Sequence, residues 1–429
     1  MRMWIITLLL FLLPAGALPA VQPESFTVGG LKVIYVSNPA TQIVSANLYF
    51  RGGVALASMQ NAGIEHLALA AAVRATKNYP REAMNAALDR MDTRINAGAG
   101  PDYSNVSMQC VKKNLAESWK IFTDVILTPS FDSAMVELER EQTLAAIRQM
   151  QDAPDQQLNR LALESFYRET PYAVDPLGTE RTVRTFSAKD LQAYMQSRVS
   201  AAQLLLVVCG NVTRAELEEM VNGSFGKLPQ GPFQAPQPAP VRHTSPTVLV
   251  VKRPLPTNYI LGLFPAPPVG SDASYAMTLG TSILSDRVFE EVRTKRSLSY
   301  AAMAMGGPNF SSYRGIYTTT VKPETTITVM VDEIKKLQNE PVSAKSLKDK
   351  RNVYVTGYYM NLETNASQAN MLAHYELSGA GYQKATKLME NMSKVTAEEI
   401  QKVCSEYIRN LQFVLIGNPV SLQLSPFMF

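Results

Sequence analysis

The sequence predicts an α+β fold built as two duplicated halves, each an antiparallel sheet with helices on one side. The first observation is a capping-box helix start at Ser187, which returns 209 residues later at Thr396. The second is a buried apolar strand that ends in Gly-Asn at Gly210, which returns 207 residues later at Gly417. Two landmarks at nearly one spacing indicate an internal duplication.

A third landmark and a linker place the boundary between the halves. Pro129 and Pro341 each precede a long helix and lie 212 residues apart. Residues 229–246 hold six prolines and little periodicity, which is typical of a semi-rigid spacer. We therefore expect an N-terminal domain at 24–228 and a C-terminal domain at 247–429.

Apolar periodicity and turn residues predict the elements of each half. The first half should hold a hairpin at 26–36, strands at 42–50, 93–100, 104–111 and 204–208, and helices around His66 and at 80–92, 115–127, 133–152 and 191–198. The second half should hold strands at 248–251, 258–264 and 311–321, a largely helical segment at 271–295, and further helices. The second half thus follows the order of the first.

The N-terminus carries a targeting pattern. Arg2 is followed by an apolar run over residues 4–13 and by small residues up to Ala20. This pattern predicts a secretory signal peptide at residues 1–20; a buried helix or a membrane anchor is the alternative. The run is too short to span a bilayer. We expect a secreted chain with no membrane span once the signal is cleaved.

Charge and cysteine content exclude some classes of function. The formal net charge is +4 with no dense block of Lys or Arg, so a nucleic-acid partner is not expected. The three cysteines, Cys110, Cys209 and Cys404, are far apart and lie in apolar settings. Their odd number and wide spacing predict buried free thiols rather than a disulfide framework or a metal site.

Several short motifs resemble one family. They are Gly63-Ile64 before His66, Ala75-Thr76, Asn96-Ala97, Pro171-Tyr172, Leu177-Gly178-Thr179-Glu180, residues 225–229 (FGKLP) and residues 285–300 (SDRVFEEVRTKRSLSY). With the duplication and the signal, the chain resembles the pitrilysin/insulinase family of zinc peptidases, the inverted zincins with an H-x-x-E-H signature. The resemblance covers nearly the whole mature chain and implies the metallopeptidase-like fold of that family.

The metal site that the resemblance implies is incomplete. The family needs His at i and i+4, Glu at i+3 and a later Glu ligand, whereas this chain has His66 followed by Leu69 and Ala70. The later ligand position is Ala146, and Glu139 matches a supporting acidic residue of the family. We expect no metal and no cofactor in this chain. The apolar or small replacements are what a filled, metal-free pocket requires.

The second half carries a different group of the family. Arg293 and Tyr300 lie seven residues apart, as do the Arg and Tyr that reach the zinc site of the other half in family members. The resemblance implies that they orient the substrate backbone and stabilise the oxyanion. It also implies that Asn96, Ala97 and Gly98 line an extended peptide, which would add as a strand. In isolation, a solvated Arg and a core Tyr would be the simpler interpretation.

The predicted function is that of a metal-free partner subunit. Some bacterial members of the family divide the work between a chain with H-x-x-E-H, which holds zinc, and a chain that lacks the metal ligands and supplies the Arg/Tyr pair. This chain resembles the second kind, which places it in the bacterial periplasm and implies a heterodimer and an extended peptide substrate. A structural or peptide-binding scaffold of the same fold is the alternative. A self-sufficient zinc metalloendopeptidase is disfavoured by the missing ligands.

Overall fold

The computed structural model describes residues 22–236, 239–419 and 421–429. The predicted signal peptide lies outside these residues. Within them, no helix is both long enough and apolar enough to cross a membrane.

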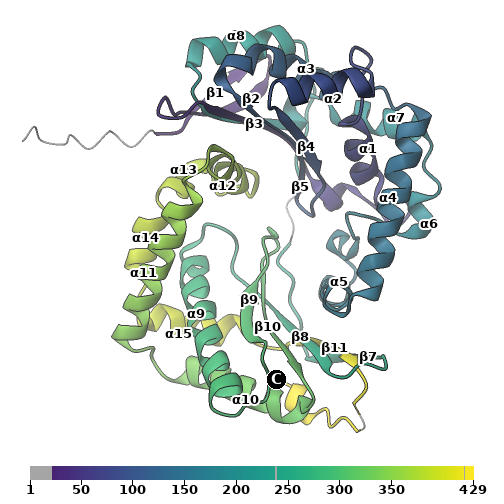
Figure 1. The fold of residues 1–429 in the computed structure, drawn as a ribbon. Coiled ribbons are helices and arrows are strands. Elements are labelled where there is room, and N and C mark those ends of the chain that lie inside the picture. The colour runs from purple at the N-terminus through teal and green to yellow at the C-terminus, as the bar shows by residue number, and fades with distance from the viewer. Residues whose placement is uncertain (1–21, 237–238, 420) are drawn as a thin grey trace, which may run out of the picture.

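Two sheets form the framework of the molecule (Figure 1). The first has the order β1-β2-β6-β3-β5-β4 and the second the order β7-β11-β8-β10-β9. The strands are β1 (Glu24–Val28), β2 (Leu31–Ser37), β3 (Ile43–Arg51), β4 (Arg94–Gly98), β5 (Tyr103–Val111), β6 (Leu204–Gly210), β7 (Thr247–Lys252), β8 (Asn258–Pro265), β9 (Ala302–Gly306), β10 (Tyr313–Thr320) and β11 (Gln412–Gly417).

The strand order repeats between the halves. The run β2-β6-β3-β5-β4 corresponds to β7-β11-β8-β10-β9, strand for strand. In each sheet the first pair of this run is parallel and the other neighbours are antiparallel. The predicted duplicated α+β unit is therefore confirmed, and the structure adds one parallel pair to each sheet that was predicted as antiparallel.

Both halves also contain a series of helices. The longer helices of the first half are α1 (Ile64–Ala72), α2 (Arg81–Arg90), α3 (Leu115–Leu127), α4 (Ser133–Asp152), α5 (Pro154–Phe166), α7 (Ala188–Arg198) and α8 (Arg214–Ser224), with the short α6 (Glu180–Val183). Those of the second half are α9 (Asp272–Val288), α10 (Pro323–Asn339), α11 (Ala344–Asn361), α12 (Asn365–Leu377), α13 (Tyr382–Thr386), α14 (Leu388–Lys394) and α15 (Ala397–Tyr407).

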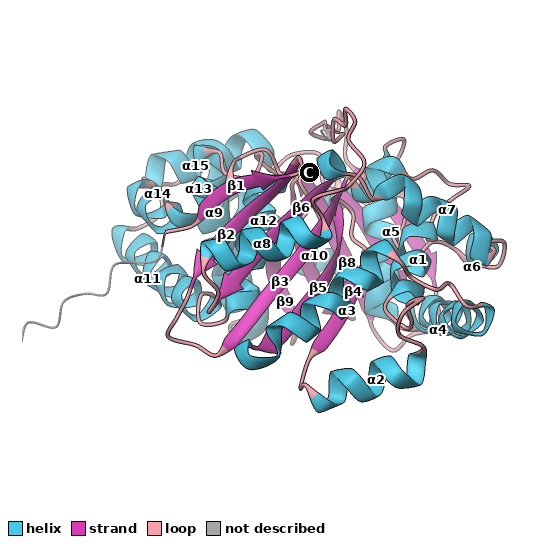
Figure 2. Ribbon diagram, turned by 90° about the horizontal axis from the view of Figure 1, so that it is seen from above, coloured by secondary structure: helices cyan, strands magenta, loops and turns pink. Residues whose placement is uncertain are grey.

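One face of each sheet carries the helices of its own half. The apolar core of the first half joins the sheet to α1, α3, α7 and α8, and Figure 2 shows α3 and α8 crossing this sheet. The core of the second half joins its sheet to α9, α10 and α15. The predicted arrangement of helices on one side of each sheet is present in both halves.

The opposite face of each sheet is covered by a helix of the other half. Helix α5 packs on β8 and β11, and α12 packs on β3 and β6 (Figure 1). Each contact has an apolar core of its own; one includes Leu158 and Leu261, and the other includes Leu372 and Leu205. Strand β6 is therefore buried on both faces, which explains its continuous apolar run.

Candidate functional site

The entry of helix α1 depends on a close contact between two of the motifs. Gly63 has φ 89°, and a Cβ there would lie 2.6 Å from the carbonyl oxygen of Leu177. Gly178 has φ 79°, and a Cβ there would lie 2.4 Å from the carbonyl oxygen of Ala62. Only glycine tolerates both the left-handed backbone and this approach. The Gly-Ile-x-His and Leu-Gly-Thr-Glu motifs thus position α1 together.

The positions of the degenerate metal site lie on α1 and α4. His66 is half-buried, and burial lowers the pKa of its imidazole below the ordinary value. Leu69 is only 2% exposed and belongs to the core of the first half, whereas Ala70 is partly buried and Ala146 is exposed. Among the described residues, no group of three His, Cys, Asp or Glu side chains could hold a metal ion. The residues at these positions do not fit zinc, because only His66 offers a ligating atom.

The acidic residues near α1 are engaged in structural contacts. Glu139 is 4% exposed, and its Oε1 accepts a hydrogen bond of 2.6 Å from Nε of Arg74, just beyond the end of α1. Glu65 accepts a hydrogen bond of 2.9 Å from the hydroxyl of Tyr194 and lies 3.8 Å from the guanidinium of Arg198. These contacts hold α1 against α4 and α7.

A cavity of about 690 Å³ lies beside Ala146, and we call it the first-half cavity. The lining includes Ala146 but not His66, Leu69 or Ala70, so the expectation of a filled pocket at those positions stays a prediction. The lining comes from α4, α5, the 172–179 segment and the loop before β10, with Ala146, Gln149, Asn159, Arg160, Leu163, Asp175, Leu177 and Tyr313 among its residues.

A buried aspartate joins the two halves next to this cavity. Asp102 is 7% exposed, and its Oδ2 accepts a hydrogen bond of 3.0 Å from the backbone N–H of Phe310. Its other oxygen accepts one from the hydroxyl of Tyr172. Burial raises the pKa of Asp102 to about 6, although both hydrogen bonds act in the opposite direction. The carboxylate is therefore a titratable group at the junction of the halves.

The predicted Arg/Tyr pair is assembled at the end of α9. Arg293 lies in a π-helical turn, Phe289–Thr294, and its Cζ is 5.0 Å from the ring centroid of Phe289 and 5.7 Å from that of Tyr300. It also donates a hydrogen bond of 3.4 Å to the backbone carbonyl of Tyr300. Tyr300 is 87% exposed, so it is not the core aromatic of the simpler interpretation. Short π-helical turns inside α-helices occur often at functional sites.

The predicted peptide-binding residues lie on an edge strand. Asn96, Ala97 and Gly98 belong to β4, which pairs only with β5 among the described strands. Its other edge can therefore accept a further strand. The fold brings Arg293 and Tyr300 into contact with each other. No described hydrogen bond or ion pair joins either residue to β4 or to α1, which carries His66, Leu69 and Ala70.

The site contains features that the sequence did not indicate to us. The first-half cavity depends on α5, which is absent from the elements expected from the sequence, where a helix ends at residue 152. Proline at the first helical position is favourable, and Leu158, Ala162 and Phe166 follow at helical spacing, so a signal was present. The three cysteines are free and buried, as predicted.

Comparisons with known proteins give one consistent result. Residues 32–180 match the family model described as insulinase (peptidase family M16), and residues 185–354 match the model described as peptidase M16 inactive domain. An uncharacterized zinc protease of Rickettsia bellii is 23% identical over 389 residues, which are 88% of this chain and 93% of that protein. The mitochondrial-processing peptidase subunit beta of Blastocladiella emersonii is 25% identical over 210 residues, 48% of this chain and 44% of that protein.

Solved structures agree on the fold. A protease from Helicobacter pylori superposes with a TM-score of 0.85 at 18% identity, covering 92% of this chain and 100% of its own. A peptidase M16 inactive domain from Pseudomonas fluorescens gives a TM-score of 0.85 at 18% identity, covering 94% of this chain and 100% of its own. At such low identity these likenesses concern the fold alone.

Proposed function

Because the chain belongs to the insulinase family (peptidase family M16), we propose that it is a metal-free subunit that assists a zinc-bearing member in cleaving peptides. The partner would carry H-x-x-E-H and hold the zinc, and this chain would supply Arg293 and Tyr300. The observation that supports the proposal is the contrast between the metal-site positions of the first half and the Arg/Tyr pair of the second half. Leu69, Ala70 and Ala146 offer no ligating atom, while the Arg/Tyr pair is preorganised and exposed.

The chemistry of the pair suits an oxyanion. Stacking on Phe289 and the contact with the Tyr300 carbonyl restrain the guanidinium of Arg293 while its other N–H groups stay available. The phenol of Tyr300 projects into solvent and can donate a second hydrogen bond. Two fixed donors aimed at one developing negative charge lower the barrier of acyl transfer, and the loss of one such donor costs about 10²–10³ in kcat.

The extended peptide would bind to the free edge of β4. Backbone N–H and C=O groups on that edge supply hydrogen bonds that do not depend on sequence, and Asn96 adds a polar side chain on the exposed face. Residues 1–20 would direct the chain to the bacterial periplasm, where the partner and the peptide would also lie.

The test is to express the chain alone and together with an H-x-x-E-H member encoded beside it. We expect the mixture to cleave an unstructured peptide and to contain one zinc per pair, and we expect the chain alone to show neither activity nor zinc. Cleavage by the chain alone, with one zinc per chain, would contradict the proposal. Full activity of the partner without this chain would instead support the scaffold alternative.

A further inference from the structure

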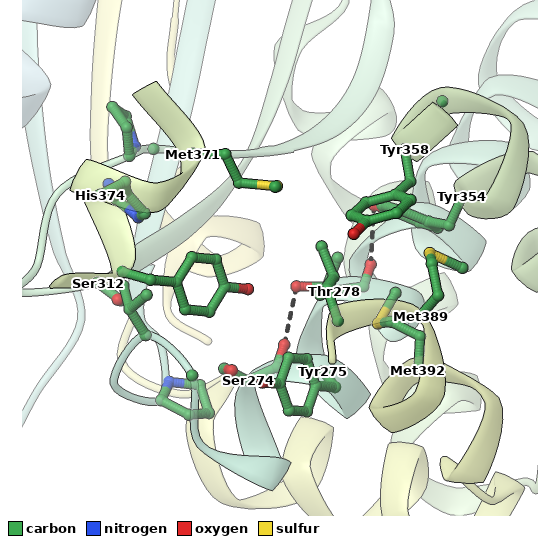
Figure 3. Close-up of a pocket in the computed structure, with 18 of the residues that line it drawn as sticks. Ser274, Tyr275, Thr278, Ser312, Tyr354, Tyr358, Met371, His374, Met389 and Met392 are labelled. Atoms are coloured by element: carbon green, nitrogen blue, oxygen red, sulfur yellow. Dashed lines mark hydrogen bonds between the residues drawn. The ribbon is translucent and has the colours of Figure 1, made fainter. Parts of the chain in front are cut away.

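A second cavity, of about 650 Å³, lies in the second half, and we call it the second-half cavity. Its walls come from α9, α11, α12, α14 and the start of β10. Figure 3 shows Met371 and His374 on one side and Tyr354, Tyr358 and Met389 across the open space. Most of the lining is aromatic or apolar, including Tyr275, Tyr354, Tyr358, Tyr375, Met371, Met389 and Met392.

One charged side chain lines this cavity among the described residues, and it has no acidic partner. Arg314 donates hydrogen bonds of 3.0 Å to the carbonyl of Tyr313 and 3.2 Å to Oγ1 of Thr278. No described ion pair includes it, and the residues outside the description contain no Asp or Glu. A largely buried guanidinium that is bonded only to neutral oxygens keeps an uncompensated positive charge.

The neighbouring groups do not compensate that charge. His374 also lines the cavity, and burial lowers the pKa of its imidazole to about 4, so it is neutral at pH 7. Burial also lowers the pKa of Arg314. The ionisable groups that act on it are Tyr313 and Tyr354, which are protonated and neutral at pH 7 because burial raises their pKa. The cavity therefore has a single positive charge in an otherwise neutral lining.

The strand pairing provides space for the guanidinium. Arg314 lies opposite Gly306 in the β9–β10 pair. A Cβ at Gly306 would lie 2.5 Å from Cδ and 2.7 Å from Cζ of Arg314, closer than real Cβ contacts allow. The glycine thus lets the side chain of Arg314 pass over the neighbouring strand β9, and its guanidinium reaches Thr278 of α9. This placement is a built feature of the fold and not that of a solvated surface arginine.

We propose that the second-half cavity binds an apolar ligand through its carboxylate, with Arg314 as the anion partner. Guanidinium and carboxylate match in geometry, and the ligand would remove the cost of the unpaired charge. A volume of about 650 Å³ lies within the range of small-ligand pockets. The occupant that fits a peptide-handling fold is the C-terminal end of an apolar peptide. The choice of a peptide as occupant rests on the proposed function, whereas the carboxylate-binding site is formed by this chain alone and does not need the proposed partner.

The first arm of the test uses the unmodified full chain and three probes in calorimetric titrations. They are N-acetyl-Leu-Ala-Leu with a free carboxylate, the same peptide as its C-terminal amide, and decanoate. We expect the free acid to bind at least tenfold more tightly than the amide. Decanoate that binds more tightly than the peptide acid would assign the same carboxylate chemistry to a fatty acid. Equal affinity of acid and amide would overturn the proposal.

The second arm removes the charge. Arg314→Met should abolish the preference for the acid, and Arg314→Lys should keep part of it because the charge remains while the planar fork is lost. Arg409→Met, which removes an exposed arginine of the same half, is the control and should bind as the unmodified chain does. Circular dichroism tests whether each variant is folded. If Arg314→Met does not fold, the affinities of Arg314→Lys for the peptide acid and the peptide amide decide this part of the test. A folded Arg314→Met that still prefers the acid would contradict the proposal.

Discussion

The two cavities occupy equivalent places in the two halves, yet their chemistry differs. Six helical lining positions correspond at a spacing of 211 residues: Ala146 with Gly357, Gln156 with Ser367, Asn159 with Asn370, Arg160 with Met371, Leu163 with His374, and Glu164 with Tyr375. In both halves they lie on a long helix and on the next helix, which crosses to the sheet of the other half. Duplication has therefore preserved the backbone that encloses a cavity.

The charges of the two linings have diverged. In the first-half cavity, Arg160 lies 3.9 Å from Glu164, and Asp175 is also present, so charges of both signs meet. In the second-half cavity, Arg314 stands without an acidic partner among the described residues. The comparison teaches that one repeated backbone arrangement can hold two chemistries, charges of both signs in the first-half cavity and a single arginine in the second-half cavity.

The largest expected effect concerns the position where the family has its catalytic Glu. Leu69 is buried in the core, whereas its counterpart at the same spacing is Gly280, which packs on Cys404. Leu69→Ala should lower the free energy of unfolding by about 3 kcal/mol, because a buried leucine leaves a cavity. Urea denaturation measures the change, and Leu249→Ala, at an exposed strand position, should cost less than about 1 kcal/mol. Equal costs would mean that Leu69 is not part of the core.

The second effect separates Asp102, which directly precedes β5, from Ser312, which directly precedes β10 and carries no carboxylate. The pKa of Asp102 is raised to about 6, so the folded state binds a proton that the unfolded state releases above its lower, ordinary pKa. This stabilisation is complete below about pH 4 and is lost as pH rises through 6. Relative to Asp102→Asn, the unmodified chain should gain up to about 3 kcal/mol between pH 7 and pH 4.

Thermal unfolding at several pH values measures this difference. The variant shares every other titrating group, so subtracting the two pH profiles isolates Asp102. Parallel profiles would show that the carboxylate titrates normally and that the junction between the halves is not sensitive to pH.

A smaller effect tests the contact that positions α1 in the first half. Gly63→Ala forces a Cβ into a left-handed backbone against Leu177 and should cost about 2 kcal/mol in unfolding free energy. Gly223→Ala, in α8 with no atom within 4 Å of the added Cβ, should be neutral or stabilise by up to about 1 kcal/mol. If both substitutions are neutral, the two glycine motifs do not support one another.

The sequence predicted the local elements better than their partners. The bounds of α3 and α4 are the predicted ones, because both helices have strong apolar periodicity and Asp132 caps α4 with its side chain. Each of α5 and α12 packs on the sheet of the other half, and this packing is not a local property. It depends on apolar faces of segments that are more than one hundred residues apart in the sequence. The two cavities are consequences of that packing and could not be predicted from either half alone.

In the candidate site, too, local features were predictable from the sequence and tertiary features were not. Motif spacing was sufficient to place Arg293 beside Tyr300, because both lie in the short segment between the end of α9 and the start of β9. Arg314 gave no such signal, since one arginine in a strand is ordinarily solvated, and only the packing of α9 and α12 encloses it. Local chemistry is thus predictable from this sequence, whereas buried charge is a property of the tertiary structure.

The measurement that tests the central claim most directly is kcat/KM of the reconstituted pair with Arg293→Ala in this chain. Arg296→Ala is the matched control, because it removes an exposed arginine three residues away that pairs with Glu291. If this chain lends Arg293 to the zinc site of its partner, kcat/KM should fall about 10²-fold in the first variant and stay within about twofold in the second. Equal activity of the two variants would contradict the account and leave a scaffold.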